Sequence, residues 1–144
     1  MTSPPFYFGE KSELKLVTCH LDLQTVMRSV IQFYDISIIW GYRNEEQQSI
    51  CYEAGNSTKK YPNSKHNHLD KNAEPLSLAV DVAPWFEESP HIRWNYEEEF
   101  IFLAGRVLQI ADMLDISITW GGDWDRDGNQ HDQHFNDLGH FELS

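Results

Sequence analysis

Hydrophobic residues follow a helical spacing in three stretches of the chain. They recur at every third or fourth position within 12–34, where Ser12 is placed to cap a single helix. The same spacing gives 96–114 a continuous apolar stripe, whereas 45–54 is more polar and is followed by Gly55, a common residue after a helix C-terminus. We therefore expect three helices.

Short β-branched or alternating stretches between these helices predict strands. They are I-S-I-I-W at 36–40, A-V-D-V-A at 79–83, I-S-I-T-W at 116–120 and G-H-F-E-L at 139–143. Residues 1–10 form an irregular lead-in, and polar, turn-rich loops cover 56–78 and 121–137. This order of elements predicts an α+β fold in which helices pack on a mostly antiparallel sheet.

Length, charge and cysteine content narrow the class of protein. A chain of 144 residues suits one domain, and we expect it to be a monomer. Its formal net charge of −12 disfavours binding to nucleic-acid phosphates and anionic membranes. No apolar run reaches the ~18 residues that span a bilayer and no secretory signal is visible, so we expect synthesis in the cytoplasm without membrane insertion. Cys19 and Cys51 lie in expected helices and match no metal or redox spacing, which predicts reduced, partly buried thiols.

Several polar residues occupy positions that suit a metal ligand. Strand alternation places Asp81 on the face of small alanines, which leaves it open, and places His140 and Glu142 together on one face of the last strand. His66 lies in the first polar loop, two residues before His68. Two imidazoles and a carboxylate suit Zn²⁺, which keeps a fourth position for water in catalytic sites. The residues alone leave open which loop histidine completes the set.

Four ordered segments resemble the M15 family of zinc peptidases, which includes the D-alanyl-D-alanine carboxypeptidases and the phage L-alanyl-D-glutamate endopeptidases. They are S-K-H-N at 64–67, A-V-D-V-A-P at 79–84, W-G-G-D-W-D at 120–125 and D-L-G-H-F-E-L at 137–143, and G-Y-R-N-E-E-Q at 41–47 is similar to the family's G-x-R segment. The resemblance runs from about Leu16 to the end of the chain. It implies that 1–144 is a single catalytic domain with a hedgehog-like α+β fold and no separate wall-binding domain.

The resemblance assigns roles to individual residues. It implies that His66, Asp81 and His140 hold zinc. It implies that Asp137 is the general base that takes a proton from water and passes it to the leaving amine. It further implies that Arg43 binds the substrate and stabilises the negative charge that develops near the scissile bond.

The spacing around the loop histidine departs from the family pattern. The family often has fewer residues between its histidine and aspartate, whereas here the extra polar sequence 67–76 separates His66 from Asp81. A loop can absorb this insertion, because closing a longer loop costs little additional free energy. The S-x-H motif that begins at Ser64 favours His66 over His68, and it places Ser64 at the expected substrate site.

A second cation site is suggested by an acidic loop. Asp123, Asp125 and Asp127, followed by Gly128, reproduce the first half of an EF-hand-type calcium loop. The bidentate glutamate that such a loop carries at its twelfth position is replaced by His134. We therefore expect at most a single Ca²⁺ site that orders this loop, and a solvated acidic turn is the alternative.

The resemblance implies hydrolysis of a peptide bond in the peptidoglycan stem peptide. We expect an L-alanyl-D-glutamate endopeptidase that acts as a phage endolysin, because a protein without a secretion signal suits release through a holin-made lesion. The first alternative is a D-alanyl-D-alanine carboxypeptidase. Another is a zinc-containing module that binds peptide or wall without catalysis, which the presence of Asp137 disfavours. A calcium-dependent interaction domain ranks last because it leaves the predicted zinc ligands unexplained.

Overall fold

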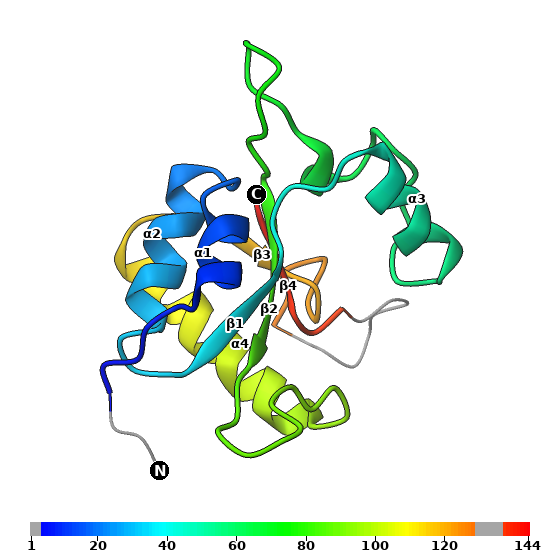
Figure 1. Cartoon of the computed structure of the whole chain (residues 1–144). Helices are drawn as coiled ribbons and strands as arrows, with labels where there is room; N and C mark the ends of the chain where they lie inside the picture. The colour runs from blue at the N-terminus through cyan, green and yellow to red at the C-terminus, as the bar shows by residue number, and fades with distance from the viewer. Residues whose placement is uncertain (1–3, 129–136) are drawn as a thin grey trace.

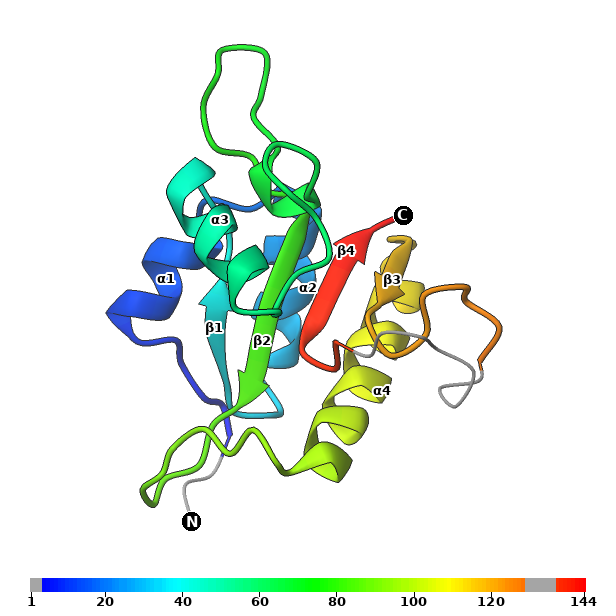
Figure 2. The same ribbon diagram turned by 90° about the vertical axis from the view of Figure 1, so that its right-hand side faces the viewer.

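An antiparallel sheet organises the part of the chain that the structure, a computed structural model, describes: residues 4–128 and 137–144. Its strands, in spatial order, are β1 (Ile36–Trp40), β2 (Ala79–Pro84), β4 (His140–Leu143) and β3 (Ile118–Trp120). Each neighbouring pair is antiparallel, and Figure 2 shows the strands side by side. The predicted α+β class and all the predicted strands are confirmed, although β3 begins two residues later than expected.

Helices cover the sheet on both faces. They are α1 (Glu10–Leu16), α2 (Leu21–Val30), α3 (Glu45–Glu53), the 3-10 helix η1 (Lys65–Asn67) and α4 (Glu97–Met113). Figure 2 shows α2 and α4 behind the strands and α3 in front of them. The core lies on the α2 and α4 side, where Val80, Val82 and Phe141 are fully buried. The opposite sides of β2 and β4 are therefore left for polar side chains.

The single helix expected over 12–34 is wrong, because the chain breaks between α1 and α2. Residues on either side of the break pair with Ser77: its N–H donates to the Thr18 carbonyl at 2.8 Å, and its carbonyl accepts from the His20 N–H at 2.8 Å. Ser12 does not cap the helix, which begins after Gly9; its hydroxyl is buried and accepts from the Ile38 N–H at 3.0 Å. Hydrogen bonds with Ser77, which is distant in sequence, thus interrupt the helix that the continuous apolar pattern predicts.

Both cysteines are free and buried, as predicted. Cys51 lies in α3, but Cys19 lies in the break between the first two helices and not in a helix. Burial raises the pKa of the Cys19 thiol to about 12. This thiol is therefore protonated at neutral pH and has little nucleophilic character.

The extra polar sequence of the first long loop forms a local excursion. Leu69 and Pro75 make an antiparallel bridge, and the Leu76 N–H donates to the His68 carbonyl at 3.0 Å. Figure 1 shows this segment projecting away from the sheet. The insertion closes on itself, so it does not displace η1 from the sheet.

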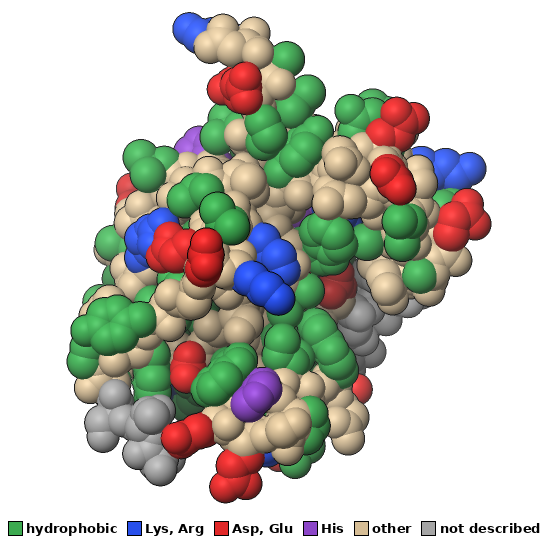
Figure 3. All heavy atoms as spheres, in the orientation of Figure 1, with side chains coloured by type: hydrophobic (Ala, Val, Ile, Leu, Met, Phe, Trp, Pro, Cys, Tyr) green, Lys and Arg blue, Asp and Glu red, His purple; other side chains and the backbone are tan. Residues whose placement is uncertain are grey.

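The surface carries mixed charge in the orientation of Figure 3, where basic side chains lie singly or in small groups among acidic and apolar ones. Among the described residues, no helix has both the length and the apolar character that crossing a bilayer requires. Among the described residues, half of the exposed large apolar side chains lie within the helices and half lie in the segments beside them.

Candidate active site

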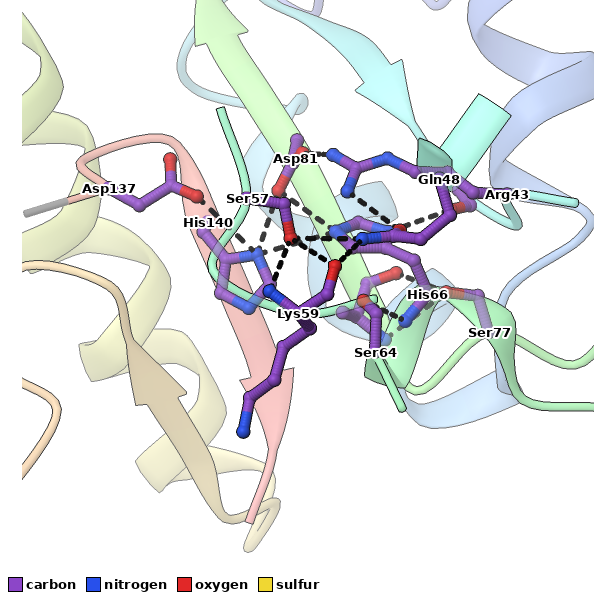
Figure 4. A network of polar contacts seen from close by, with 12 residues as sticks. Arg43, Gln48, Ser57, Lys59, Ser64, His66, Ser77, Asp81, Asp137 and His140 are labelled. Atoms are coloured by element: carbon purple, nitrogen blue, oxygen red, sulfur yellow. Dashed lines mark hydrogen bonds and ion pairs between the residues drawn. The ribbon is translucent and has the colours of Figure 1, made fainter. Parts of the chain in front are cut away.

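Three predicted metal ligands meet on the polar face of the sheet (Figure 4). Asp81 of β2 pairs in register with His140 of β4, and η1 brings His66 over both. The Asp81 Oδ1 atom lies 3.2 Å from His66 Nε2 and 2.9 Å from His140 Nδ1, and the two nitrogens are 3.3 Å apart. Ser64 caps η1, its hydroxyl accepting from the His66 N–H at 3.2 Å. The structure therefore brings together residues that the long loop separates.

Outer contacts fix the tautomer of each histidine. His66 Nδ1 donates to the Gly41 carbonyl at 2.8 Å, and His140 Nε2 donates to the Glu142 carboxylate at 2.8 Å. When both rings are neutral, their inner nitrogens therefore present lone pairs, and both face a carboxylate oxygen of Asp81. Three acceptors so close together require a positive charge between them, and these residues could hold a metal. Donor atoms around a tetrahedral zinc lie roughly 3.3 Å apart, which these separations fit.

The pKa values of the cluster also indicate that a positive charge is held between these residues. Burial lowers the pKa of His140, but hydrogen bonds with Asp81 and Glu142 outweigh it and raise that pKa to about 10. Burial lowers the pKa of His66 more than Asp81 raises it. Burial also opposes ionisation of Asp81, yet the two histidines hold the pKa of its carboxyl below the usual range. A metal ion binding here would displace the proton on His140.

The face around Asp81 is not as open as the sequence predicts. Ala79 and Ala83 are fully buried, and the Asp81 side chain is 13 % exposed. Packing of η1 and of the residues around Cys19 against β2 covers this side of the strand. Asp81 is therefore largely covered, and it lines one of the cavities beside the cluster.

Arg43 lies behind the Asp81 carboxylate. Its Nη2 donates to Asp81 Oδ2 at 2.7 Å, its Nη1 donates to Gln48 Oε1 at 3.3 Å, and its guanidinium lies 5.0 Å from the centre of the Trp40 ring. The Arg43 side chain is only 5 % exposed. The contacts visible here hold and neutralise Asp81. The substrate-binding role expected for Arg43 stays a prediction.

A buried glutamine links this arginine to the rim of the site. Gln48 is fully buried, and its Oε1 accepts from Arg43 and from Asn67 Nδ2, the latter at 3.3 Å. Its Nε2 donates to Ser57 Oγ at 2.9 Å and to the Lys59 carbonyl at 2.7 Å. Sequence reasoning missed Gln48 and Asn67, because nothing in the polar run E-E-Q-Q marks one glutamine as facing inward.

Asp137, the predicted base, lies beside the cluster. Its Oδ2 is 3.9 Å from His140 Nδ1, and its side chain is 31 % exposed. Burial and the nearby Asp81 charge raise the pKa of its carboxyl to about 6. Its backbone N–H donates to the Gly121 carbonyl at 2.9 Å, and a Cβ on Gly121 would lie 2.1 Å from the Asp137 carbonyl oxygen. This close approach requires glycine and fixes the position of Asp137.

Two cavities of about 630 and 750 Å³ meet at the cluster. Both are lined by Arg43, Asn56 and Asp137. The first, which we call the lysine cleft, also contains Lys59, Lys65, Ser64 and the two histidines of the cluster. The second, which we call the tryptophan cleft, also contains Trp40, Trp94, Phe100 and Glu97. A chain-like substrate could therefore extend to both sides of Asp137.

The other predicted ligands lie outside this centre. His68 is exposed, and its Nδ1 donates to the Leu76 carbonyl at 2.9 Å, so the structure favours His66. Carboxylate oxygens of Asp123, Asp125 and Asp127 lie within 4.8 Å of one another. The second half of this acidic loop, including the expected twelfth position at 134, lies outside the described residues.

An antiparallel sheet that carries a His–Asp–His cluster beside a raised-pKa carboxylate is consistent with a metallopeptidase. The chain belongs to the phage L-alanyl-D-glutamate peptidase family, whose sequence model matches residues 4–144. It is 33 % identical to the L-alanyl-D-glutamate peptidase of Escherichia phage T5, over 96 % of this chain and 98 % of that protein. These matches confirm the predicted family and its peptidase class.

The fold has a solved counterpart. The L-Ala D-Glu endopeptidase ChiX of Serratia marcescens superposes with a TM-score of 0.70, at 24 % sequence identity, over 96 % of this chain and 90 % of that one. This likeness confirms the fold.

Proposed function

We propose that this protein is a zinc-dependent endopeptidase that cleaves the L-alanyl-D-glutamate bond of the peptidoglycan stem peptide. The observation that carries the proposal is the convergence of three acceptor atoms with fixed tautomers next to Asp137, in a chain of this family. The donor set of two imidazoles and a carboxylate suits zinc better than Mg²⁺ or Ca²⁺, which prefer oxygen ligands.

In this proposal His66, Asp81 and His140 hold the zinc. A bound zinc would polarise the scissile carbonyl and lower the pKa of a water molecule. Asp137 takes the proton of the attacking water and delivers it to the leaving amine, a task that suits a carboxyl whose pKa is raised to about 6. Arg43 pairs with the Asp81 carboxylate and adds positive charge where the oxyanion develops.

Ser64 contributes mainly by orienting the loop histidine. Its hydroxyl already accepts the His66 N–H, and it lines the lysine cleft. We propose that the Ser64 hydroxyl also donates to the substrate backbone. It has this capacity because its proton is not used in accepting the His66 hydrogen bond.

The two cavities favour an endopeptidase over a D-alanyl-D-alanine carboxypeptidase. A carboxypeptidase needs room for only one terminal residue beyond the scissile bond, whereas both clefts here reach about 600 Å³ or more on either side of Asp137. A non-catalytic zinc module would have no need of a raised-pKa carboxyl at 3.9 Å from a ligand histidine.

The proposed substrate places the site of action at the cell wall. We propose that the enzyme is made in the cytoplasm, reaches the wall after holin-dependent release, and works as a monomeric endolysin.

The acidic loop of Asp123, Asp125 and Asp127 remains our candidate for a Ca²⁺ site, supported by the convergence of their oxygens. Isothermal titration without a calcium heat at millimolar concentration would remove this second ion.

The test is digestion of purified peptidoglycan by the zinc-loaded protein, with and without a chelator, followed by mass spectrometry. New L-alanine C-termini together with D-glutamate N-termini, lost on chelation and restored by zinc, would support the proposal. Released terminal D-alanine would indicate the carboxypeptidase instead. The absence of cleavage by a protein that holds one zinc would indicate the binding module. Asp137→Asn serves as the inactive control that keeps the ligands.

A further inference from the structure

The basic residues of the lysine cleft differ in how far their charge is already neutralised. Arg43 is paired with Asp81 at 2.7 Å. Lys65 is paired with Glu142 at 3.0 Å and also donates to the Leu143 carbonyl. Lys59 has an exposed side chain and makes no ion pair with any described residue. Among these cleft cations, the Lys59 ammonium is therefore the one available to an anionic ligand.

The backbone of Lys59 is nonetheless held in place by hydrogen bonds with residues of the site. Its carbonyl accepts from the buried Gln48 at 2.7 Å, and its N–H donates to Ser57 Oγ at 3.2 Å. Gln48 also binds Arg43, so the backbone at Lys59 is tied to the group that holds Asp81. Figure 4 shows the Lys59 side chain leaving this network, with its ammonium beyond the polar contacts. The Lys59 ammonium is thus exposed, while its backbone is held by hydrogen bonds with residues of the site.

No lysine is among the described residues that line the tryptophan cleft, whereas the lysine cleft holds Lys59 and Lys65 beside the acidic Asp125 and Glu142. The walls of the tryptophan cleft carry the aromatic rings of Trp40, Trp94 and Phe100, and its charged side chains beyond the shared ones are the acidic Glu97 and Asp81. Trp94 is stacked on Phe100 with ring centres 5.8 Å apart and remains 62 % exposed. Negative charge on a substrate is therefore disfavoured on this side of the cluster, and flat or apolar groups are favoured.

The proposed substrate carries a negative charge next to its scissile bond on one side and no charge on the other. In the stem peptide, the amine of D-glutamate receives the alanyl group and its side-chain carboxyl continues the chain, which leaves an α-carboxylate next to the scissile nitrogen. The alanyl half carries no charge and leads to a sugar. We propose that the D-glutamyl half lies in the lysine cleft, where Lys59 binds this α-carboxylate, and that the alanyl half lies in the tryptophan cleft. This inference rests on the proposed function and adds the orientation of the substrate.

Substrates that differ only in this carboxylate test the assignment. The zinc-loaded enzyme is given matched muramyl peptides that contain either D-glutamate or D-isoglutamine, in which an amide replaces the α-carboxylate. Lys59→Gln is compared with Lys60→Gln, which removes the same charge from the next residue. Lys60 lies over the Tyr52 ring at 5.1 Å and is not part of the cleft wall.

We expect the wild type and Lys60→Gln to prefer the D-glutamyl substrate by roughly three- to tenfold, mainly through KM, because an exposed charge-assisted contact is formed before and during the reaction. Lys59→Gln should cleave both substrates equally, with unchanged zinc content, and added salt should reduce the preference of the wild type. A preference that survives in Lys59→Gln, or a wild type without preference, would overturn the inference. Cleavage of neither substrate by the wild type would instead overturn the proposed function.

Discussion

Replacing Asp137 by asparagine should remove activity and at the same time stabilise the metal-free protein at neutral pH. The pKa of this carboxyl is raised from 3.8 to about 6, first by burial and then by the charge of Asp81. A raised pKa means that the folded state holds the proton more tightly than the unfolded chain. Its contribution to stability is therefore fully present below pH ~3.8 and is lost as the pH rises through about 6.

The magnitude follows from the size of this change. Each pKa unit corresponds to about 1.4 kcal/mol, so the difference between 3.8 and about 6 sets an upper limit of roughly 3 kcal/mol. The Asp137 side chain is 31 % exposed, so water screens part of this cost. We expect Asp137→Asn to raise the free energy of unfolding by about 1–2 kcal/mol at pH 7.5 and to leave it almost unchanged at pH 3.5.

Urea unfolding in the presence of a chelator measures this difference at both pH values. Asp112→Asn, at an exposed position of α4, controls for the loss of one negative charge. Peptidoglycan turnover by the zinc-loaded variants is measured in parallel, and Asp137→Asn should bind zinc but lose most turnover. An equal effect on stability at both pH values would refute the raised pKa of Asp137. Undiminished turnover would refute its assignment as the general base.

Four further substitutions test the centre. His66→Ala should abolish stoichiometric zinc binding while His68→Ala preserves it, as zinc content after dialysis will show; equal loss would contradict the choice of ligand. Arg43→Met removes the arginine partner of the mostly buried Asp81 carboxylate, which then keeps only its contacts with the two histidines, and should cost up to about 3–5 kcal/mol of stability, visible as a lower urea midpoint. An unchanged midpoint would argue against the pairing. Glu142→Gln weakens the acceptor behind a ligand imidazole and should lower zinc affinity about 10–100-fold in a chelator competition, whereas unaltered affinity would rule out that support.

Strand alternation made part of the site predictable. In A-V-D-V-A and G-H-F-E-L, the apolar Val80, Val82 and Phe141 face the core, so Asp81 and His140 must face the other way. Because the two strands are antiparallel neighbours, these side chains meet directly. The resemblance to a peptidase family then selected the residues whose chemistry matters.

The sequence by itself determined the features that depend on near neighbours in the chain. These are the strands, the long helix α4, and the face on which each strand residue lies. Only the tertiary structure decided the rest. It broke the first helix through Ser77, placed the Gly41 carbonyl behind His66, and buried Gln48 beneath the rim. These contacts join segments that lie far apart in sequence or depend on packing, and no local pattern encodes which distant polar group will satisfy a buried one.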